Sequence, residues 1–361
     1  MEAIHERLLA WFDAHKRDLP WRGAGDPYAV WISEVMLQQT RVAFVAPYYR
    51  RWMERFPDVG ALADADLEEV LRLWRGLEYY ARARNAHRCA RQVRDGHGGE
   101  FPPSADRLMA LPGIGPYTAA AVASIAFGEA VPAVDGNVRR VVARLFDLPD
   151  PSLAQVRRLA AELMDTARPG DFNEAMMELG ATVCTPRSPK CGACPLAAAC
   201  RARAAGTVAE RPRRRRRGPV PTRTWDVQVA VSPRGRTLVV RRPREGLLGG
   251  MWEFPAVEVE DGTDTGARPM RVAEPAVGGG EGGGRAPAAR SMQVAEPVVG
   301  TVVELPPVTH RFSHFTAVYR PQRVEVAAEW GEAAGRWVTS SELADLPLPV
   351  AQQRIARAAG F

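Results

Sequence analysis

The sequence predicts two domains of different class, an all-α domain over residues 1–204 and a smaller α+β domain over residues 225–361. In the first domain apolar side chains recur at intervals of three and four, and after Thr224 the interval becomes two. Between the two, the run Arg211–Pro219 is too charged to bury apolar surface. We therefore predict a basic linker at 205–224, acting as a solvated tether, with contact to an anionic partner as the alternative.

Composition places the chain among globular proteins. Hydrophobic residues make up 46% of its 361 residues, and no run of eighteen apolar residues is present that could cross a membrane. The first sixteen residues place charged side chains between apolar ones at helical spacing, which predicts an amphipathic helix and not a secretory signal. We expect a cytoplasmic protein. The net charge of +6 favours an anionic partner only weakly, because a general bias toward arginine codons explains it equally well: Lys16 and Lys190 are the only lysines.

Further helices follow from the same spacing at Ala61–Leu73, Ala119–Ala126 and Leu153–Thr166. Segments with glycine and proline, at 111–113 and 167–170, separate the helices. No strand-like alternation interrupts this part of the sequence, which supports the all-α class.

The first functional motif is Leu111–Thr118, with the sequence Leu-Pro-Gly-Ile-Gly-Pro-Tyr-Thr, between two helical stretches. Gly113 and Gly115 allow a tight turn and a close approach of the backbone to another chain. The free N–H groups at the start of the following helix favour an anion such as a phosphate. An ordinary turn between two helices is the alternative. The constrained pattern favours a helix–hairpin–helix DNA-binding motif over 104–127.

The second motif is a pair of carboxylates separated in sequence. Glu34 lies in the apolar helical run Val30–Thr40, where burial would raise its pKa and hold a proton for donation. Asp135 is expected at a helix N-cap, where N–H groups and the helix dipole would keep it ionised. A proton donor and a fixed negative charge are what cleavage of a glycosidic bond requires. Taken singly, a surface glutamate and a simple cap remain the stronger interpretations.

The third motif contains four of the five cysteines, Cys184, Cys191, Cys194 and Cys200, with the spacing C-x6-C-x2-C-x5-C. Clustered cysteines in a chain without a signal peptide indicate metal ligation rather than disulfides. The compact spacing suits a four-iron cluster, but from ligand type alone zinc is about as plausible. Cys89 stands apart, and we expect a buried helical thiol.

The second domain begins with two alternating segments, Trp225–Val231 and Thr237–Val240, separated by a turn at Ser232–Gly235. This pattern predicts a hairpin. Further strands are expected at Val302–Leu305 and Phe315–Tyr319.

Together these motifs resemble the adenine DNA glycosylases of the MutY type, in the helix–hairpin–helix endonuclease III superfamily. The segment Trp31–Thr40 resembles the catalytic helix of that family, and Val134–Val138 resembles its second active-site segment. The cysteine spacing matches the family's iron–sulfur loop, here 184–200. The resemblance covers nearly all of 1–200 and parts of 225–361. It implies one 4Fe–4S cluster instead of zinc, and it implies catalytic roles for both carboxylates.

The resemblance implies a monomeric enzyme of base excision repair that removes adenine mispaired with 8-oxoguanine or guanine from double-stranded DNA. Glu34 would protonate the flipped adenine, and Asp135 would stabilise the oxocarbenium-like sugar, with Tyr117 and Asn137 supporting the site. Relatives that also nick the backbone carry a lysine at the position of Tyr117. We therefore expect a monofunctional glycosylase without strong lyase activity.

The resemblance also implies residues that hold the substrate. Arg22 and Glu174 resemble residues of the adenine pocket, and Gln38 belongs to the DNA-binding set. Gln39 and Tyr79 resemble side chains that enter the base stack as the adenine leaves it. For Tyr79, packing in the core is the alternative.

In the second domain, Arg311–Phe315 resembles the loop that recognises 8-oxoguanine opposite the adenine. Phe312 would act as a wedge, and Ser313 and His314 would hydrogen-bond a base edge. The surrounding sequence, notably Gly249–Pro255, resembles a Nudix (MutT-like) fold, but its glutamate-rich metal-binding helix is not visible. We expect this domain to recognise the lesion and not to hydrolyse nucleotides.

Two features depart from the family pattern. Glu78 stands where the usual Gly-Leu-Gly-Tyr-Tyr has its second glycine, so a positive φ there would strain the backbone. An added negative charge near phosphates would also weaken DNA binding. The glycine-rich stretch 261–300, which contains a near-repeat, occupies the place of an expected helix, and we predict a disordered surface insertion there.

Two other functions remain open. An oxidised-pyrimidine glycosylase with AP lyase activity would share the fold, although Tyr117 argues against it. A non-catalytic, damage-binding or redox-sensing iron–sulfur protein would bind DNA without releasing a base.

Overall fold

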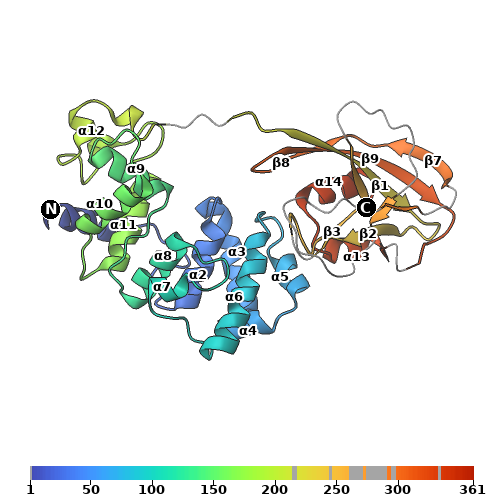
Figure 1. The fold of residues 1–361 in the computed structure, drawn as a ribbon, viewed down its shortest axis with the longest axis horizontal. Coiled ribbons are helices and arrows are strands. Elements are labelled where there is room, and N and C mark those ends of the chain that lie inside the picture. The colour runs from blue at the N-terminus through green and yellow to red at the C-terminus, as the bar shows by residue number, and fades with distance from the viewer. Residues whose placement is uncertain are drawn as a thin grey trace, which may run out of the picture. The chain divides into compact units, whose positions relative to one another are not determined.

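The computed structural model describes residues 2–213, 218–243, 246–259, 271–273, 291–293, 298–331 and 335–361. Its chain divides into two compact units, Met1–Ala65 with Arg82–Arg217, and Asp66–Ala81 with Gly218–Phe361. Helices build the first unit and a sheet builds most of the second (Figure 1). The segment 66–81, which the sequence places in the helical domain, groups with the second unit. Among the described residues, no helix combines the length and apolar character needed to cross a membrane.

The described part of the first unit is all-helical, which confirms the predicted class. Its helices are α1 (Glu2–His15), α2 (Pro27–Leu37), α3 (Val42–Arg55), α4 (Val59–Asp64), α6 (Ala81–His97), α7 (Ala105–Leu108), α8 (Pro116–Phe127), α9 (Gly136–Leu145), α10 (Leu153–Leu163), α11 (Pro169–Thr182) and α12 (Arg201–Ala204). Two short 3-10 turns, η1 (Cys191–Ala193) and η2 (Val208–Glu210), follow α11 and α12.

One predicted helix, Ala61–Leu73, is wrong, because the chain breaks it into α4 and α5 (Leu67–Leu73). Ala65 and Asp66 adopt extended backbone angles between the two helices. Asp66 is the N-cap residue of α5, a position that aspartate favours. The carbonyl of Ala65, freed from helical hydrogen bonding, lies 2.9 Å from Nε2 of His87.

Two packed groups of helices position the site. All residues of α2 from Tyr28 to Met36 are buried, and Asp26 caps the start of this helix through the N–H groups of Tyr28 and Ala29. A second core joins α1, α9, α10 and α11 around Phe12 and Phe172, which are almost fully buried. The burial of α2 on all sides explains why its single carboxylate, Glu34, is almost fully buried.

The first part of the predicted linker is anchored to the first unit. Arg211 pairs with Asp147 through an Nε–Oδ1 contact of 2.7 Å, and the N–H of Arg213 donates to the carbonyl of Pro149. Arg144 donates to the carbonyls of Val208 and Arg211. The tether prediction is therefore wrong for 208–213, because these polar groups find partners on the helical unit, while 214–217 lie outside the described residues.

The second unit contains a mixed sheet with the strand order β10-β2-β1-β9-β7. Its elements are β1 (Thr222–Val231), β2 (Thr237–Arg241), β3 (Trp252–Glu253), β4 (Ala256–Val259), β7 (Val298–Glu304), β8 (Val308–Arg311), β9 (Thr316–Val326), β10 (Arg336–Val338), α5, α13 (Ser340–Asp345) and α14 (Val350–Ala358). The predicted β1–β2 hairpin and the strands near 302–305 and 315–319 are confirmed. β8 and β9 pair antiparallel, so the turn between Arg311 and Thr316 presents the predicted recognition residues.

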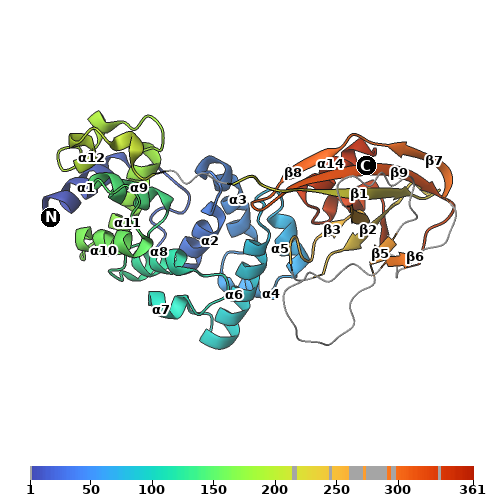
Figure 2. The same ribbon diagram turned by 45° about the horizontal axis from the view of Figure 1, so that its top comes forward.

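Most of the predicted insertion 261–300 lies outside the described residues. Two short segments within it, β5 (Arg271–Ala273) and β6 (Ser291–Gln293), pair antiparallel with each other (Figure 2). These segments belong to the near-repeat, and they differ from the disorder predicted for the whole stretch. Two similar sequences with strand-compatible residues can satisfy one another's backbone groups in a ladder.

Candidate active site

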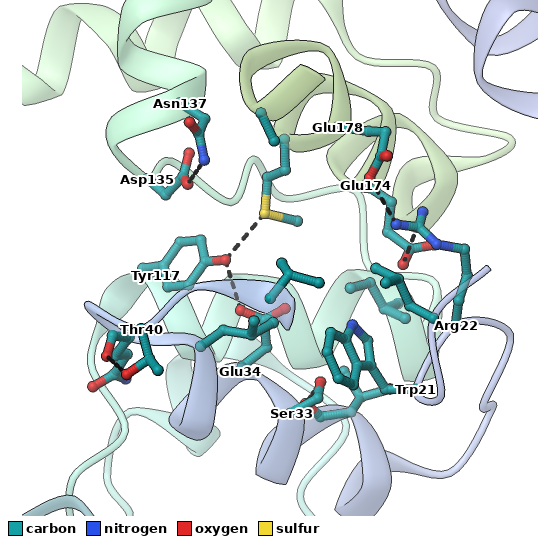
Figure 3. A pocket seen from close by; sticks show the side chains of 18 of the residues that line it. Trp21, Arg22, Ser33, Glu34, Thr40, Tyr117, Asp135, Asn137, Glu174 and Glu178 are labelled. Carbon is teal, nitrogen blue, oxygen red and sulfur yellow. Dashed lines mark hydrogen bonds and ion pairs between the residues drawn. The ribbon is translucent and has the colours of Figure 1, made fainter. Parts of the chain in front are cut away.

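One cavity of about 500 Å³ brings together the predicted chemical residues of the first unit (Figure 3). Side chains from α2, α8, α9 and α11 line it, together with the segment before α2. Of the predicted residues, those that line the cavity are Arg22, Glu34, Gln38, Gln39, Tyr117, Asp135, Asn137 and Glu174. Residues distant in sequence thus converge on one space large enough for a small molecule or a nucleobase.

Glu34 is the buried acid of the cavity, with only 6% of its surface exposed. Burial on α2, with a smaller contribution from the nearby Asp135 charge, raises its pKa to about 7. The hydroxyl of Tyr117 donates to Oε2 of Glu34 over 2.6 Å and opposes this shift. Because Oε2 is occupied by this hydrogen bond, Oε1 is the oxygen that can carry a transferable proton. The sequence prediction of a buried, proton-holding glutamate agrees with this geometry.

Tyr117, at the start of α8, remains a neutral hydroxyl. Burial and the neighbouring carboxylates raise its pKa well above the usual value. Its oxygen also contacts Sδ of Met177 at 3.0 Å. The side chain is therefore fixed on two sides, and it can orient Glu34 without supplying a nucleophile of its own.

Asp135 is the predicted N-cap of α9, and its Oδ1 accepts the N–H of Val138 over 2.7 Å. The side-chain amide of Asn137 donates to Oδ2 over 2.8 Å. Burial raises the pKa of Asp135, and these hydrogen bonds lower it by a smaller amount. The cap prediction is correct, but the cap does not outweigh burial. The pair of carboxylates therefore consists of an acid with a pKa near neutrality and a hydrogen-bonded aspartate.

A charged network closes the other end of the cavity. The carboxylate of Glu178, which is 2% exposed, accepts hydrogen bonds from Nε of Arg17 at 2.5 Å and from Nη2 of Arg22 at 2.9 Å. Nη1 of Arg22 lies 3.5 Å from Oε1 of Glu174 and has no hydrogen-bond partner among the described residues. Burial raises the pKa of Glu174, and Arg22 partly opposes this. Sequence reasoning missed Arg17 and Glu178, although Glu178 lies one helical turn after Glu174.

The hairpin glycines lie before α8 and do not line the cavity. Gly113 has φ +77°, and an added Cβ there would lie 2.5 Å from Cβ of Asn85, so both the backbone and the space require glycine. Gly115 is the N-cap of α8 in an extended conformation that any residue can adopt. The prediction of a tight glycine turn is thus confirmed at Gly113 alone.

A chain of hydrogen bonds connects Asp135 to the cysteine loop. Arg140 donates through Nη2 to Oδ1 of Asn137 and through Nε to the carbonyl of Cys184, over 2.8 and 2.7 Å. The same Nη2 donates to the carbonyl of Gly180. Asn137 then donates to Asp135, so hydrogen bonds link the Asp135 carboxylate to the backbone of Cys184.

The cysteine loop has the donor set of an iron–sulfur site. Cys184, Cys194 and Cys200 pack against the core of the first unit, and burial raises the pKa of the Cys194 thiol, with smaller contributions from the other three cysteines. Nη1 of Arg144 donates to Sγ of Cys184 over 3.3 Å. The described residues contain no set of three or more His, Cys, Asp or Glu side chains arranged to hold a single metal ion. The chemistry of four thiols with a buried arginine fits a cluster.

The remaining predicted residues lie in the second unit. Ser313 and His314 are exposed in the turn between β8 and β9, whereas Phe312 is half-buried and stacks on Phe315 with ring centres 4.8 Å apart. Tyr79 is 42% exposed, so the core-packing alternative is wrong for it. Its neighbour Glu78 has φ +60°, the left-handed conformation expected for the glycine it replaces.

Three protein-family models match the chain. The HhH-GPD superfamily base excision DNA repair protein model covers residues 32–166, and the NUDIX domain model covers 227–358. The iron-sulfur binding domain of endonuclease III covers 184–200, which holds the four cysteines. These matches confirm the helix–hairpin–helix and Nudix-like fold classes, and they confirm the predicted iron–sulfur cofactor over zinc.

Solved structures support the helical fold. A thermostable thymine-DNA glycosylase matches with a TM-score of 0.53 and 28% identity, over 56% of this chain and 96% of that one. A trapped covalent intermediate of endonuclease III with DNA matches with a TM-score of 0.50 and 28% identity, over 57% of this chain and 96% of that one.

Curated relatives identify the family. The human adenine DNA glycosylase is 43% identical over 72% of this chain, which spans 58% of the human protein's length. That of Mycolicibacterium smegmatis is 48% identical over 57% of this chain and 73% of its own length. That of Schizosaccharomyces pombe is 35% identical over 72% of this chain and 70% of its own length. The chain belongs to the adenine DNA glycosylases.

Proposed function

We propose that the protein hydrolyses the N-glycosidic bond of adenine mispaired with 8-oxoguanine or guanine in double-stranded DNA. The observation that carries this proposal is the cavity shared by Glu34 and Asp135. One carboxyl group has a pKa near 7, and the other is held by an N–H group and an amide. Pairs of titratable groups in such different environments divide acid and electrostatic roles between them.

In this mechanism the adenine leaves the base stack and enters the cavity. Glu34 donates its proton from Oε1 to the base, which makes the base a better leaving group as the glycosidic bond breaks. Asp135 faces the sugar and stabilises the positive charge that develops there. Water then adds to the sugar carbon and loses its proton to the Glu34 carboxylate, which restores the acid and leaves free adenine and an abasic site.

Arg22 and Glu174 suit recognition of the adenine itself. The donor Nη1 of Arg22 has no hydrogen-bond partner among the described residues, so a ring nitrogen of the base could accept from it. Glu174, 3.5 Å from Arg22, could accept from the exocyclic amine. Glu178 is saturated by Arg17 and Arg22, which assigns it to fixing the arginines rather than to binding the base.

The cysteine loop would hold the 4Fe–4S cluster through Cys184, Cys191, Cys194 and Cys200, and the bound cluster would supply a rigid cross-link of this loop. The chain's own contribution is the link from Cys184 through Arg140 to Asn137. In the second unit, Ser313 and His314 would contact the 8-oxoguanine, with Phe312 as the stacking side chain.

The test uses the purified protein with its cluster and a duplex containing one adenine opposite 8-oxoguanine. Released adenine, and a strand break at that position only after hot alkali, are expected. Intact DNA would end the proposal. No lysine is among the described residues that line the cavity, so borohydride should trap no protein–DNA adduct. A trapped adduct would favour the lyase alternative, and tight binding without adenine release would favour the non-catalytic one.

A further inference from the structure

Arg82 lies at the start of α6 and caps a different helix, α2. The helix α2 ends at Leu37, and the backbone then turns sharply, because Gln39 has φ +58°. The last carbonyls of any helix lack partners within that helix. Nη1 of Arg82 lies 2.8, 3.0 and 2.8 Å from the carbonyl oxygens of Val35, Met36 and Gln38, and its two N–H groups are shared among these three acceptors.

The same guanidinium also reaches past the end of the helix. Its Nη2 lies 3.4 Å from Oγ1 of Thr40, so Arg82 spans the whole turn from residue 35 to residue 40. A positive charge at a helix C-terminus is favourable because it opposes the helix dipole. Arg82 is half-buried and is not among the residues that line the cavity, so these hydrogen bonds connect it to the cavity through this turn.

The turn that Arg82 holds carries the mouth of the cavity. Gln38, Gln39 and Thr40 all line it, and the Gln38 amide donates to Oγ1 of Thr118 over 3.3 Å. Glu34 lies one helical turn earlier and is fixed separately by Tyr117. Loss of Arg82 would therefore release residues 38–40 while the acid keeps its own hydrogen bond.

We propose that Arg82 is a positioning residue that fixes Gln38 and Gln39 at the cavity mouth, and so controls entry of the adenine rather than cleavage of its bond. This inference rests on the proposed function, because it assumes that a base enters the cavity. The left-handed backbone at Gln39 needs stabilising contacts from another part of the chain, since a non-glycine residue rarely keeps a positive φ unaided.

The test separates base entry from bond cleavage in the cluster-containing protein. A duplex with fluorescent 2-aminopurine opposite 8-oxoguanine reports unstacking by stopped flow, and single-turnover adenine release reports the complete reaction. Arg82→Gln should slow unstacking about tenfold and slow release of adenine in parallel, because the charge and the bidentate fork are lost. Arg82→Lys should slow unstacking only about threefold, since the charge remains. Arg91→Gln, an exposed position on the same helix, should match the wild type.

A wild-type unstacking rate in both Arg82 variants would overturn the inference. So would a slower adenine release with unchanged unstacking, because that result places Arg82 in bond cleavage. Far-UV melting of each variant shows whether it is folded, and Arg82→Lys retains the test if Arg82→Gln does not fold. If the wild-type protein unstacks the base but releases no adenine, the proposed function fails while the Arg82 inference is still decided by the fluorescence.

Discussion

The helical unit and the sheet unit present their candidate functional side chains in opposite ways. In the first, Glu34 is 6% exposed and lies inside a cavity with Asp135. In the second, Ser313 and His314 are exposed at the tip of a hairpin. The difference fits the role that we propose for each group. A proton donor at neutral pH needs burial to raise its pKa, whereas a group that reads a base edge must reach out to it.

This comparison implies two separable kinds of defect. Changes in the cavity should slow bond cleavage with any opposite base, and changes in the hairpin should alter preference between opposite bases with little effect on the chemical step.

The largest effect is expected for Glu34→Gln. The amide keeps the shape of the side chain and can accept the hydrogen bond from Tyr117, but it has no acidic proton to transfer. Single-turnover adenine release should therefore fall by about 10³-fold or more. DNA affinity, measured by fluorescence anisotropy, should stay within about twofold, since little of the binding energy depends on this buried side chain. Glu162→Gln, an exposed glutamate on α10, is the matched control. Full activity in Glu34→Gln would show that Glu34 is not the general acid.

A somewhat smaller loss is expected for Asp135→Asn. Asparagine can still cap α9, so the fold should persist, but the negative charge that we propose to face the sugar is lost. Single-turnover release should fall by about 10²- to 10³-fold, in the range seen when one electrostatic contact to a transition state is removed. A drop of less than twofold, with an unchanged melting temperature, would mean that Asp135 serves only as the helix cap.

An intermediate effect should come from Arg140→Met, which cuts the link between the Cys184 carbonyl and Asn137. Asp135 would keep its backbone hydrogen bond but lose the fixed orientation of Asn137, so release should slow by about tenfold. Arg139→Met, at the half-buried neighbour that pairs with Asp150, is the control. Cluster absorbance in the visible range checks that the loop is intact, and a wild-type rate with an intact cluster would show that the link is not needed.

The smallest effect is expected in the hairpin. Ser313→Ala removes one hydrogen-bonding group, so preference for adenine opposite 8-oxoguanine over adenine opposite guanine should fall by about fivefold. The rate of release opposite guanine should not change. An equal loss with both opposite bases would contradict the division between the two units, because the hairpin would then act on cleavage.

Local patterns in the sequence predicted the structural features that depend on residues close together in the chain. The cap at Asp135, the glycine turn at Gly113 and the apolar helix around Glu34 all agree with the structure, because each follows from residues within one or two turns. The break between α4 and α5 at Asp66 was missed, since apolar spacing continues across it and the competing cap signal is a single residue.

What the sequence could not predict arises from distant contacts. The network of Arg17, Arg22 and Glu178 joins residues more than 150 positions apart, and periodicity carries no information on such pairs. The pKa of Asp135 also depends on how deeply the folded cavity buries it, which outweighs the local cap. Arg82 was missed for the same reason, because the helix it caps lies about 45 residues earlier in the sequence.

The pH dependence of adenine release tests whether Glu34 is the proton donor and Asp135 the stabilising negative charge. Burial raises the pKa of Glu34 to about 7, so the proton it must donate is present below that pH and is lost above it. We predict that kcat/KM falls about tenfold per pH unit above 7. The residual activity of Glu34→Gln should show no such fall. A flat profile in the wild type between pH 6 and about 9, or the same fall in the variant, would contradict the account.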